Sequence, residues 1–494
     1  MVTVRNDALN LALDTTDNPY LMGGFAPVDT EITAEDLTVI GEIPADLNGL
    51  YVRNGPNPQH APAGRYHWFD GDGMLHAIHF RDGTATYRNR WVRTIGFHRE
   101  AQANSVLYTG MIEPSNDNPQ DGPLRHHYRS LKDTANTDVV FHNGNLVALW
   151  YMAGEPYRVD PHTLDTLGTE DWGGDRQGCV SAHAKIDERT GELLFFDYGP
   201  EPPYMWYGVV TADGVLRHYV PVPLPAARMP HDMAITEHYS VLMDLPLYAD
   251  PEVFASGRHK LVFDRDLPAR FAVLPRYGDT SEVRWFEAEP CYAYHSINAW
   301  EEGDSIVMDL CRTRQPKPPA QPFTGPLESV LEYLRLDAQW YRYRFNLRTG
   351  TTTEGPMDDL NTEFPVVNSA FLGRRSRYSY NVAIENSYTT LFDGIVKYDG
   401  DTGSGARFDF GPGRWGSEAP FAPRSGAIAE DDGYLVSFVY DEGDGHSECV
   451  IIDAETMSEV ARVIIPQRIP NGFHACWVPQ ASLDERASRA NGRG

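Results

Sequence analysis

Short runs of alternating apolar and polar residues, each broken by a turn signal, dominate the chain. In AIHFRDGTATYRNRWV (77–92), VVFHNGNLVALWYM (139–152) and GYLVSFVYDEGDGHSECVIIDAETMSEVARVII (433–465), Val, Ile, Tyr, Phe and Thr alternate with polar residues. The breaks are Asp-Gly, Asn-Gly or Thr-Gly. Alternation with a period of two indicates β-strands joined by hairpins rather than helices.

A second pattern recurs where predicted strands end. A strand ends in Asp or Asn, Thr or Thr-Gly follows a few residues later, and a new strand begins. Examples are Asp160 to Thr163, Asp187 to Gly191, Asn346 to Gly350 and Asp453 to Thr456. We interpret them as polar hairpins that close the outer edges of sheets. Many hairpins over 494 residues, without alternating helices, predict an all-β fold of the β-propeller type, although the repeat is too degenerate to count blades.

One segment has a clear helical pattern. In PLESVLEYLRL (326–336), the apolar residues fall at helical spacing after a proline-rich stretch. We interpret it as a packed surface helix; a cap or a docking patch is the alternative. No linker divides the chain. We therefore expect an N-terminal extension at 1–35, a single propeller domain at 36–480 with loops and short helices capping one face, and a disordered C-terminal tail at 481–494.

Composition narrows the partners and the compartment. The chain has 70 acidic and 42 basic residues and a formal net charge of −28, which argues against nucleic acid or an anionic membrane surface as the main partner. Its five cysteines include no CxxC pair, which disfavours a disulfide framework and a zinc ribbon. The start of the sequence lacks the pattern of a signal peptide, and no stretch is apolar for the length of a membrane span. We expect a cytoplasmic protein that acts on a small neutral or apolar molecule.

Four histidines lie in short strand-like runs far apart in the sequence. They are His183 in CVSAHAKID, His231 in RMPHDMAIT, His295 in CYAYHSINAW and His474 in NGFHACWV. A single histidine of this kind is usually a core group. Inner strands of a propeller converge on its axis, however, so distant histidines could meet there. Four neutral imidazoles would suit a divalent first-row metal, and octahedral iron would keep room for dioxygen.

Several motifs resemble the carotenoid cleavage oxygenase family, which includes the retinal pigment epithelial membrane protein and the apocarotenoid and lignostilbene dioxygenases. They lie at 51–80, 133–149, 268–278, 363–365 and 422–441, in family order. The chain resembles a member of bacterial type, and this resemblance implies a propeller of seven blades with one axial Fe(II). The family's four iron ligands match His183, His231, His295 and His474. Its members split an alkene C=C bond with O2 into two carbonyl products.

The family also has glutamates that accept the far N–H of three ligands, which fixes each imidazole and raises its basicity. Glu363 in NTEFPVV and Glu418 in WGSEAPFAP match two of them. The third position departs from the family, because Tyr151 stands where a glutamate is usual. A phenol is uncharged at neutral pH, so we expect its ligand, His231, to be less basic. Glu155, close in the sequence, is the alternative partner.

The resemblance leaves the substrate open. Some members cleave carotenoids or apocarotenoids, and others cleave stilbenes or phenylpropenes of the lignostilbene and isoeugenol type. Stilbene-cleaving relatives tend to have a lysine where this chain has Trp150. Because Trp150 and Tyr151 make the site aromatic, we favour an apocarotenoid. The family layout also places His60 and Trp68 near the mouth of the substrate tunnel and allows a peripheral membrane contact for substrate uptake.

Other classes of protein stay open on the sequence alone. A calcium-dependent propeller hydrolase or lactonase is suggested only by the acidic FDGDGM (69–74), which lacks the rest of a calcium loop. A membrane-bound isomerase of the same family and a non-catalytic propeller scaffold are the others. Four histidines and two glutamates in family positions favour the oxygenase. Metal content separates the classes, since the oxygenase predicts iron, the hydrolase calcium and the scaffold none.

Overall fold

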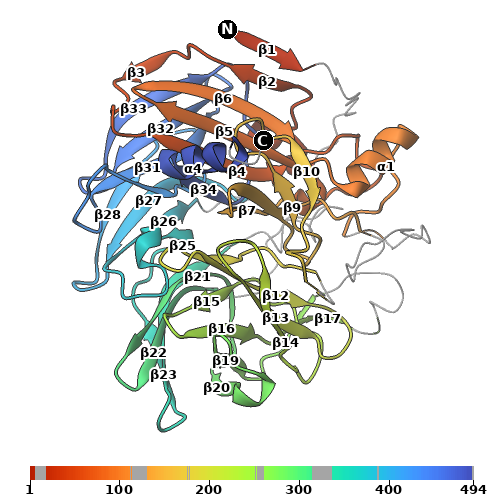
Figure 1. Ribbon diagram of the computed structural model, residues 1–494, viewed down its shortest axis with the longest axis vertical. Helices are drawn as coiled ribbons and strands as arrows, with labels where there is room; N and C mark the ends of the chain where they lie inside the picture. Colours follow the sequence, from red (N-terminus) through yellow and green to blue (C-terminus); the bar gives the residue numbers. More distant parts are fainter. Residues whose placement is uncertain are drawn as a thin grey trace.

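The strands surround a central axis (Figure 1). The computed structural model describes residues 1–5, 18–111, 113, 131–174, 176, 179–250, 252, 261–313, 336–385 and 389–491. These residues form seven sheets of four to six strands and one two-stranded sheet. The predicted all-β propeller with seven blades is confirmed.

Each blade is an antiparallel sheet, and the blades are numbered here from one to seven along the chain. Blade one contains β1 (Val2–Arg5), β2 (Glu31–Ala34), β6 (Thr84–Trp91), β5 (Gly73–Arg81), β4 (Gly49–Pro56) and β34 (Ala475–Pro479). Blade two contains β10 (Thr166–Thr169), β9 (Tyr157–Val159), β8 (Asn145–Leu149) and β7 (Asp138–His142). Blade three contains β11 (Lys185–Asp187), β12 (Glu192–Tyr198), β13 (Met205–Val210) and β14 (Leu216–Pro221). Blade four contains β15 (Met233–Ile235), β16 (Tyr239–Asp244), β19 (Ala269–Pro275) and β20 (Arg284–Ala288).

The remaining blades follow the same plan. Blade five contains β21 (Tyr292–Glu302), β22 (Ser305–Thr313), β23 (Ala338–Asn346) and β24 (Thr352–Pro356). Blade six contains β25 (Thr362–Val366), β26 (Tyr378–Ile384), β27 (Phe392–Asp399) and β28 (Ser404–Asp409). Blade seven contains β29 (Arg414–Trp415), β30 (Phe421–Pro423), β31 (Gly433–Asp441), β32 (His446–Asp453), β33 (Ser458–Ile465) and β3 (Val39–Gly41). The two-stranded sheet is β17 (Leu247–Ala249) with β18 (Leu261–Phe263).

Both ends of the chain close the ring (Figure 1). Near the C-terminus, β34 pairs with β4 and becomes the innermost strand of blade one. Near the N-terminus, β3 pairs with β33 and becomes the outermost strand of blade seven. Apolar clusters fill the space between neighbouring blades; one joins β4, β5 and β6 to β31, β32 and β33, and another joins blades four and five. The first and last blades are thus held together by both pairing and packing.

The predicted hairpin turns are present. The side chain of Asp160 accepts hydrogen bonds from the backbone of the next turn, and Asn346 and Asp453 do the same. Such a side-chain acceptor closes a turn that would otherwise expose backbone N–H groups. Two of these turns do not lie at an outer edge, which corrects the prediction. The turn at Asp187 joins β11 and β12, the innermost pair of blade three, and the turn at Asp453 joins β32 and β33, inside the outermost strand β3 of blade seven.

The proposed limits of the domain need two corrections. The described part of the segment 1–35 is not separate from the propeller, because β1 pairs with β2, and β2 pairs with β6 and extends blade one. The C-terminal segment, predicted to be disordered, forms helix α4 (Gln480–Asn491). Leu483 of α4 is buried, and Arg486 pairs with Asp160 at 2.6 Å. The polar composition was misleading because one buried leucine and a few polar contacts, including that of Gln480 with His79 at 2.7 Å, hold this helix against the propeller.

We expect Leu483→Ala to lower the free energy of unfolding by about 2–4 kcal/mol, the usual range for emptying a buried leucine site. Leu483 is 1% exposed, whereas Leu167, which is 47% exposed, gives a matched control. Urea denaturation followed by tryptophan fluorescence measures both variants. Equal small effects for Leu483→Ala and Leu167→Ala would show that α4 does not pack on the propeller in solution.

The other predictions on the fold have mixed outcomes. Nearly all of the helix predicted at 326–336 lies outside the described residues. Within them, the second α-helix is α1 (Ile95–Ala103), which begins after Thr94 caps its first turn. In the part of the chain described, no helix has the length and apolar character needed to cross a membrane. All five cysteines are free, in agreement with the absence of a disulfide framework.

Candidate metal centre

The four predicted histidines meet on the propeller axis. The innermost strands β34, β7, β11, β15, β21 and β25 contact one another in sequence around that axis. The ring centroid of His183 lies 4.7 Å from that of His231, 4.9 Å from that of His295 and 4.5 Å from that of His474. His295 is 5.1 Å from His231 and 4.6 Å from His474. Blades three, four, five and one therefore each contribute one imidazole to a single cluster.

The histidines occupy a different local position from the one expected. Three lie just before their inner strands rather than within them: His474 precedes β34, and His183 and His231 precede β11 and β15. His183 has a positive φ of 70°, a conformation that strands exclude. Only His295 lies inside a strand, at an irregularity in the pairing of β21 with β22. Starting a strand at the axis leaves the preceding side chain free to turn inward.

The cluster suits a divalent metal ion. One ring nitrogen from each of His183, His231 and His295 lies within 4.8 Å of the others. The Nε2 atoms of His183 and His295 are buried without a hydrogen-bond partner, which is costly unless another ligand satisfies them. Burial, together with neighbouring imidazoles, lowers the pKa of these three histidines. They are therefore neutral at pH 7, the form that binds metal.

Two buried glutamates hold two of the imidazoles from behind. Glu363 Oε2 is hydrogen-bonded to Nδ1 of His295 and accepts the backbone N–H of Phe364 at 2.8 Å. Burial raises the pKa of Glu363 to about 8. Glu418, in the gap between β29 and β30, lies 3.1 Å from Nδ1 of His474 through Oε1. Burial alone would lower the pKa of His474, but the charge and the hydrogen bond of Glu418 outweigh burial, so that the net effect is a raised pKa.

Tyr151, which stands where the family usually has a glutamate, lies beside His231. The rings of Tyr151 and His231 are 6.0 Å apart, and the phenol of Tyr151 donates a hydrogen bond to Sδ of Met111 at 3.3 Å. Glu155 does not replace the missing carboxylate, because it pairs with Arg176 at 3.1 Å. Within the described residues the side chain of His231 forms no hydrogen bond, so it is packed but not held by its ring nitrogens.

An aromatic cavity opens beside the histidines. It encloses about 450 Å³ of space free of protein atoms, part of it open to solvent. His231, His295 and His474 are among the residues that line it, and the rest of the lining is largely aromatic, with Trp68, Phe69, Tyr151, Tyr294, Phe364 and Phe473. No charged side chain is among the described residues that line it. Of the predicted substrate contacts, Trp68 is on this wall.

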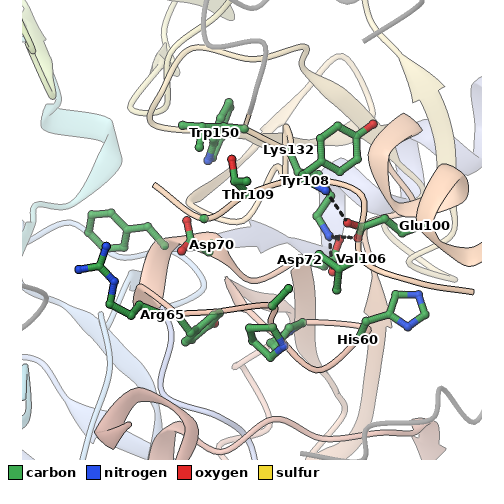
Figure 2. A pocket seen from close by; sticks show the side chains of 17 residues that line it. His60, Arg65, Asp70, Asp72, Glu100, Val106, Tyr108, Thr109, Lys132 and Trp150 are labelled. Atoms are coloured by element: carbon green, nitrogen blue, oxygen red, sulfur yellow. Dashed lines mark hydrogen bonds and ion pairs between the residues drawn. The ribbon is translucent and has the colours of Figure 1, made fainter. Parts of the chain in front are cut away.

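The other two predicted substrate contacts, His60 and Trp150, line a separate pocket (Figure 2). Phe69 lines both spaces, so the two adjoin. In this second pocket the ammonium of Lys132 lies between Asp72, at 2.9 Å, and Glu100, at 2.5 Å (Figure 2). The acidic FDGDGM run therefore balances an internal cation. Among the described residues, the group of metal-type ligands close enough to share an ion is the histidine cluster.

Among the cavity residues that sequence reasoning missed, Phe364 and Thr137 have a recognisable signal. Phe364 stacks on His474 with 4.6 Å between ring centroids and has a positive φ of 45°. Thr137 lines the cavity just before β7, as the histidines precede their own strands. Its place before an inner strand is the signal that could have revealed Thr137. Phe364 could have been found from its place next to Glu363.

Comparisons with known proteins agree with this site. The chain matches the retinal pigment epithelial membrane protein family over residues 25–479. It is 40% identical to the carotenoid 9,10(9',10')-cleavage dioxygenase of Crocus sativus, with 94% of this chain and 90% of that protein covered. Among solved structures, the lignostilbene dioxygenase of Pseudomonas brassicacearum has a TM-score of 0.82 and 29% identity over 94% of this chain and 99% of its own. A cobalt-substituted Synechocystis apocarotenoid oxygenase has a TM-score of 0.80 and 29% identity over 92% of this chain and 98% of its own.

Fold and site together define a class of protein, a seven-bladed propeller with an imidazole cluster on its axis and an aromatic cavity beside it. Within that class, the chain belongs to the retinal pigment epithelial membrane protein family, which includes the carotenoid cleavage oxygenases. The resemblance inferred from the sequence motifs is confirmed.

Proposed function

We propose that the protein is an Fe(II)-dependent oxygenase that cleaves a C=C bond of an apolar conjugated alkene, with an apocarotenoid as the favoured substrate. The observation that carries this proposal is an aromatic cavity whose lining includes three histidines of the buried cluster. His183, His231, His295 and His474 would hold one iron ion per chain. When bound, iron supplies the redox chemistry through which dioxygen and an alkene react to give two carbonyl products.

The protein's own residues contribute orientation. Four neutral imidazoles leave the charge of a bound cation uncompensated, which favours an electron-rich ligand in the cavity. The carboxylates of Glu363 and Glu418 keep a proton on Nδ1 of His295 and His474, so that Nε2 is free to bind metal. These two imidazoles thus keep one tautomer and one orientation through turnover.

The cavity contributes position and dryness. A conjugated chain can lie against Phe69, Tyr294 and Phe364, whose ring faces suit flat π-systems. With no charged group among its described lining residues, the cavity favours an uncharged substrate and offers no general acid or base apart from the histidines. A reaction that consumes only alkene and dioxygen needs no such group.

A hydroxystilbene is the second candidate substrate. Thr137, Tyr151 and Thr390 line the cavity, and each has a hydroxyl group that could bind a phenol. Trp150, which stands where stilbene-cleaving relatives tend to have lysine, lines the neighbouring pocket instead. Without that cation, a phenol loses its strongest partner, which favours the polyene.

The test is a paired product assay. Iron-loaded protein receives an apocarotenal or, separately, a hydroxystilbene in air, and aldehyde products are identified by mass spectrometry. We expect iron-dependent aldehydes from the apocarotenal and little product from the stilbene, with none from metal-free protein. Cleavage of the stilbene alone would assign the chain to the other branch. Products that form equally without iron would overturn the proposed chemistry.

A further inference from the structure

Two of the four imidazoles have no carboxylate on their rings. Glu363 and Glu418 hold His295 and His474, whereas no side chain of the described residues is hydrogen-bonded to the ring of His183 or His231. An imidazole that can rotate or shift loses its alignment with a bound ion. The fold must therefore fix these two residues in another way.

Asp138 holds the backbone of His183. This residue of blade two is 6% exposed, and its Oδ2 accepts the backbone N–H of His183 in blade three at 2.9 Å. Its Oδ1 accepts the N–H of Val139 at 2.7 Å, which fixes the carboxylate itself. His183 adopts a φ of 70°, which L-residues rarely populate, so this conformation needs support from outside. The hydrogen bond from Asp138 provides it.

Asp232 links the three blades that carry His183, His231 and His295. It follows His231 directly and is 1% exposed. Its Oδ2 accepts both the backbone N–H and the hydroxyl of Ser296, each at 2.7 Å. Its Oδ1 pairs with the ammonium of Lys185 at 2.7 Å. Ser296 adjoins His295, and Lys185 is two residues beyond His183, so this one carboxylate ties the segment that carries His231 to the segments that carry the other two histidines.

We propose that Asp138 and Asp232 are positioning residues of the metal centre, which hold through the backbone the two imidazoles that no carboxylate holds by the ring. This inference rests on the proposed function, in which the four histidines bind iron. In this chain Asp232 contributes more to the position of its histidine than Asp138 does, because Tyr151 lies beside the ring of His231 where the family has a glutamate.

The test compares Asp138→Asn, Asp232→Asn and a control, Asp309→Asn. Asp309 is likewise a buried acid, 4% exposed, and binds Arg342 at 2.7 and 2.8 Å within blade five. Co(II) is the probe: its affinity is measured against a chelator, its coordination by visible absorption, and folding by thermal denaturation. We expect about tenfold weaker Co(II) binding and a changed spectrum for the first two variants only. Asp309→Asn should lower the melting temperature and leave both metal readouts unchanged.

A rescue experiment tests the assignment of each carboxylate to its histidine. Adding Tyr151→Glu supplies a carboxylate next to the ring of His231, so it should restore Co(II) affinity to Asp232→Asn but not to Asp138→Asn. If Asp232→Asn fails to fold, Ser296→Ala removes one of its hydrogen bonds more gently and is expected to give the same spectral change.

The outcomes separate the inference from the proposal beneath it. The positioning role is overturned if Asp138→Asn and Asp232→Asn both fold and keep the wild-type Co(II) affinity and spectrum. Ser296→Ala takes the place of Asp232→Asn if the latter does not fold. The metal site itself would stand in either case. Equal rescue of both aspartate variants by Tyr151→Glu would also overturn the positioning role, because the effect would then be general. Wild-type protein that binds no Co(II) would instead overturn the proposed metal centre, and the inference with it.

Discussion

Replacing His295 by alanine is expected to abolish iron binding and alkene cleavage together. His295 contacts all three of the other histidines. Its ring centroid lies 4.9 Å from that of His183, 5.1 Å from that of His231 and 4.6 Å from that of His474. Its removal takes away one ligand and leaves the carboxylate of Glu363, which is fully buried, without its imidazole partner. A buried carboxyl group that loses its hydrogen-bond partner is costly, so the remaining histidines are not expected to hold their arrangement.

Iron content after loading, measured by mass spectrometry of the metal, and aldehyde formation from an apocarotenal check this result. The control is His238→Ala, since the side chain of His238 is 70% exposed and its Nδ1 pairs with Glu301 at 3.0 Å. It should bind iron and turn over substrate as the wild type does. A His295→Ala variant that retains both iron and cleavage would show that the metal lies elsewhere.

The class of fold could be predicted from local pattern, but its closure could not. Alternating residues and aspartate-capped turns, such as those at Asp160 and Asp453, depend on neighbours in the sequence and therefore predict hairpins well. The number of blades came from the resemblance, because blades differ in their strands and loops. The pairings of β34 with β4 and of β3 with β33 join residues more than 400 positions apart. No local pattern carries that information.

The four histidines that cluster on the axis, and the two glutamates behind them, could be picked out from the sequence because their motifs resemble those of the family. The residues that hold these side chains in place could not be predicted in this way. In the sequence, Asp138 and Asp232 look like ordinary turn residues. Only the three-dimensional structure shows that both are buried and that each is hydrogen-bonded to a neighbouring blade. Glu155 looked suitable because it is close to Tyr151 in the sequence, yet Arg176 takes its carboxylate. Proximity in the sequence says little about which charge a buried acid will meet.

Glu363→Ala is expected to weaken iron binding by about 10–100-fold, the range found when a residue behind a metal ligand is removed. That range corresponds to about 1.4–2.7 kcal/mol of binding free energy. Glu363 Oε2 holds both Nδ1 of His295 and the backbone N–H of Phe364, which has an unusual positive φ. Alanine frees the imidazole and the strained residue whose ring stacks on His474. The dissociation constant is measured by chelator competition.

Glu363→Gln separates the hydrogen bond from the charge. An amide oxygen can still accept from His295 but cannot raise its basicity as a carboxylate does, so its affinity for iron should fall between those of wild type and Glu363→Ala. Thermal denaturation without metal serves as the control, because burial raises the pKa of Glu363 to about 8 and a neutral amide in its place should cost the metal-free protein little. Iron affinity equal to wild type in both variants would mean that packing alone orients His295. An affinity lower for glutamine than for alanine would mean that the amide N–H₂ competes with the imidazole for the same space.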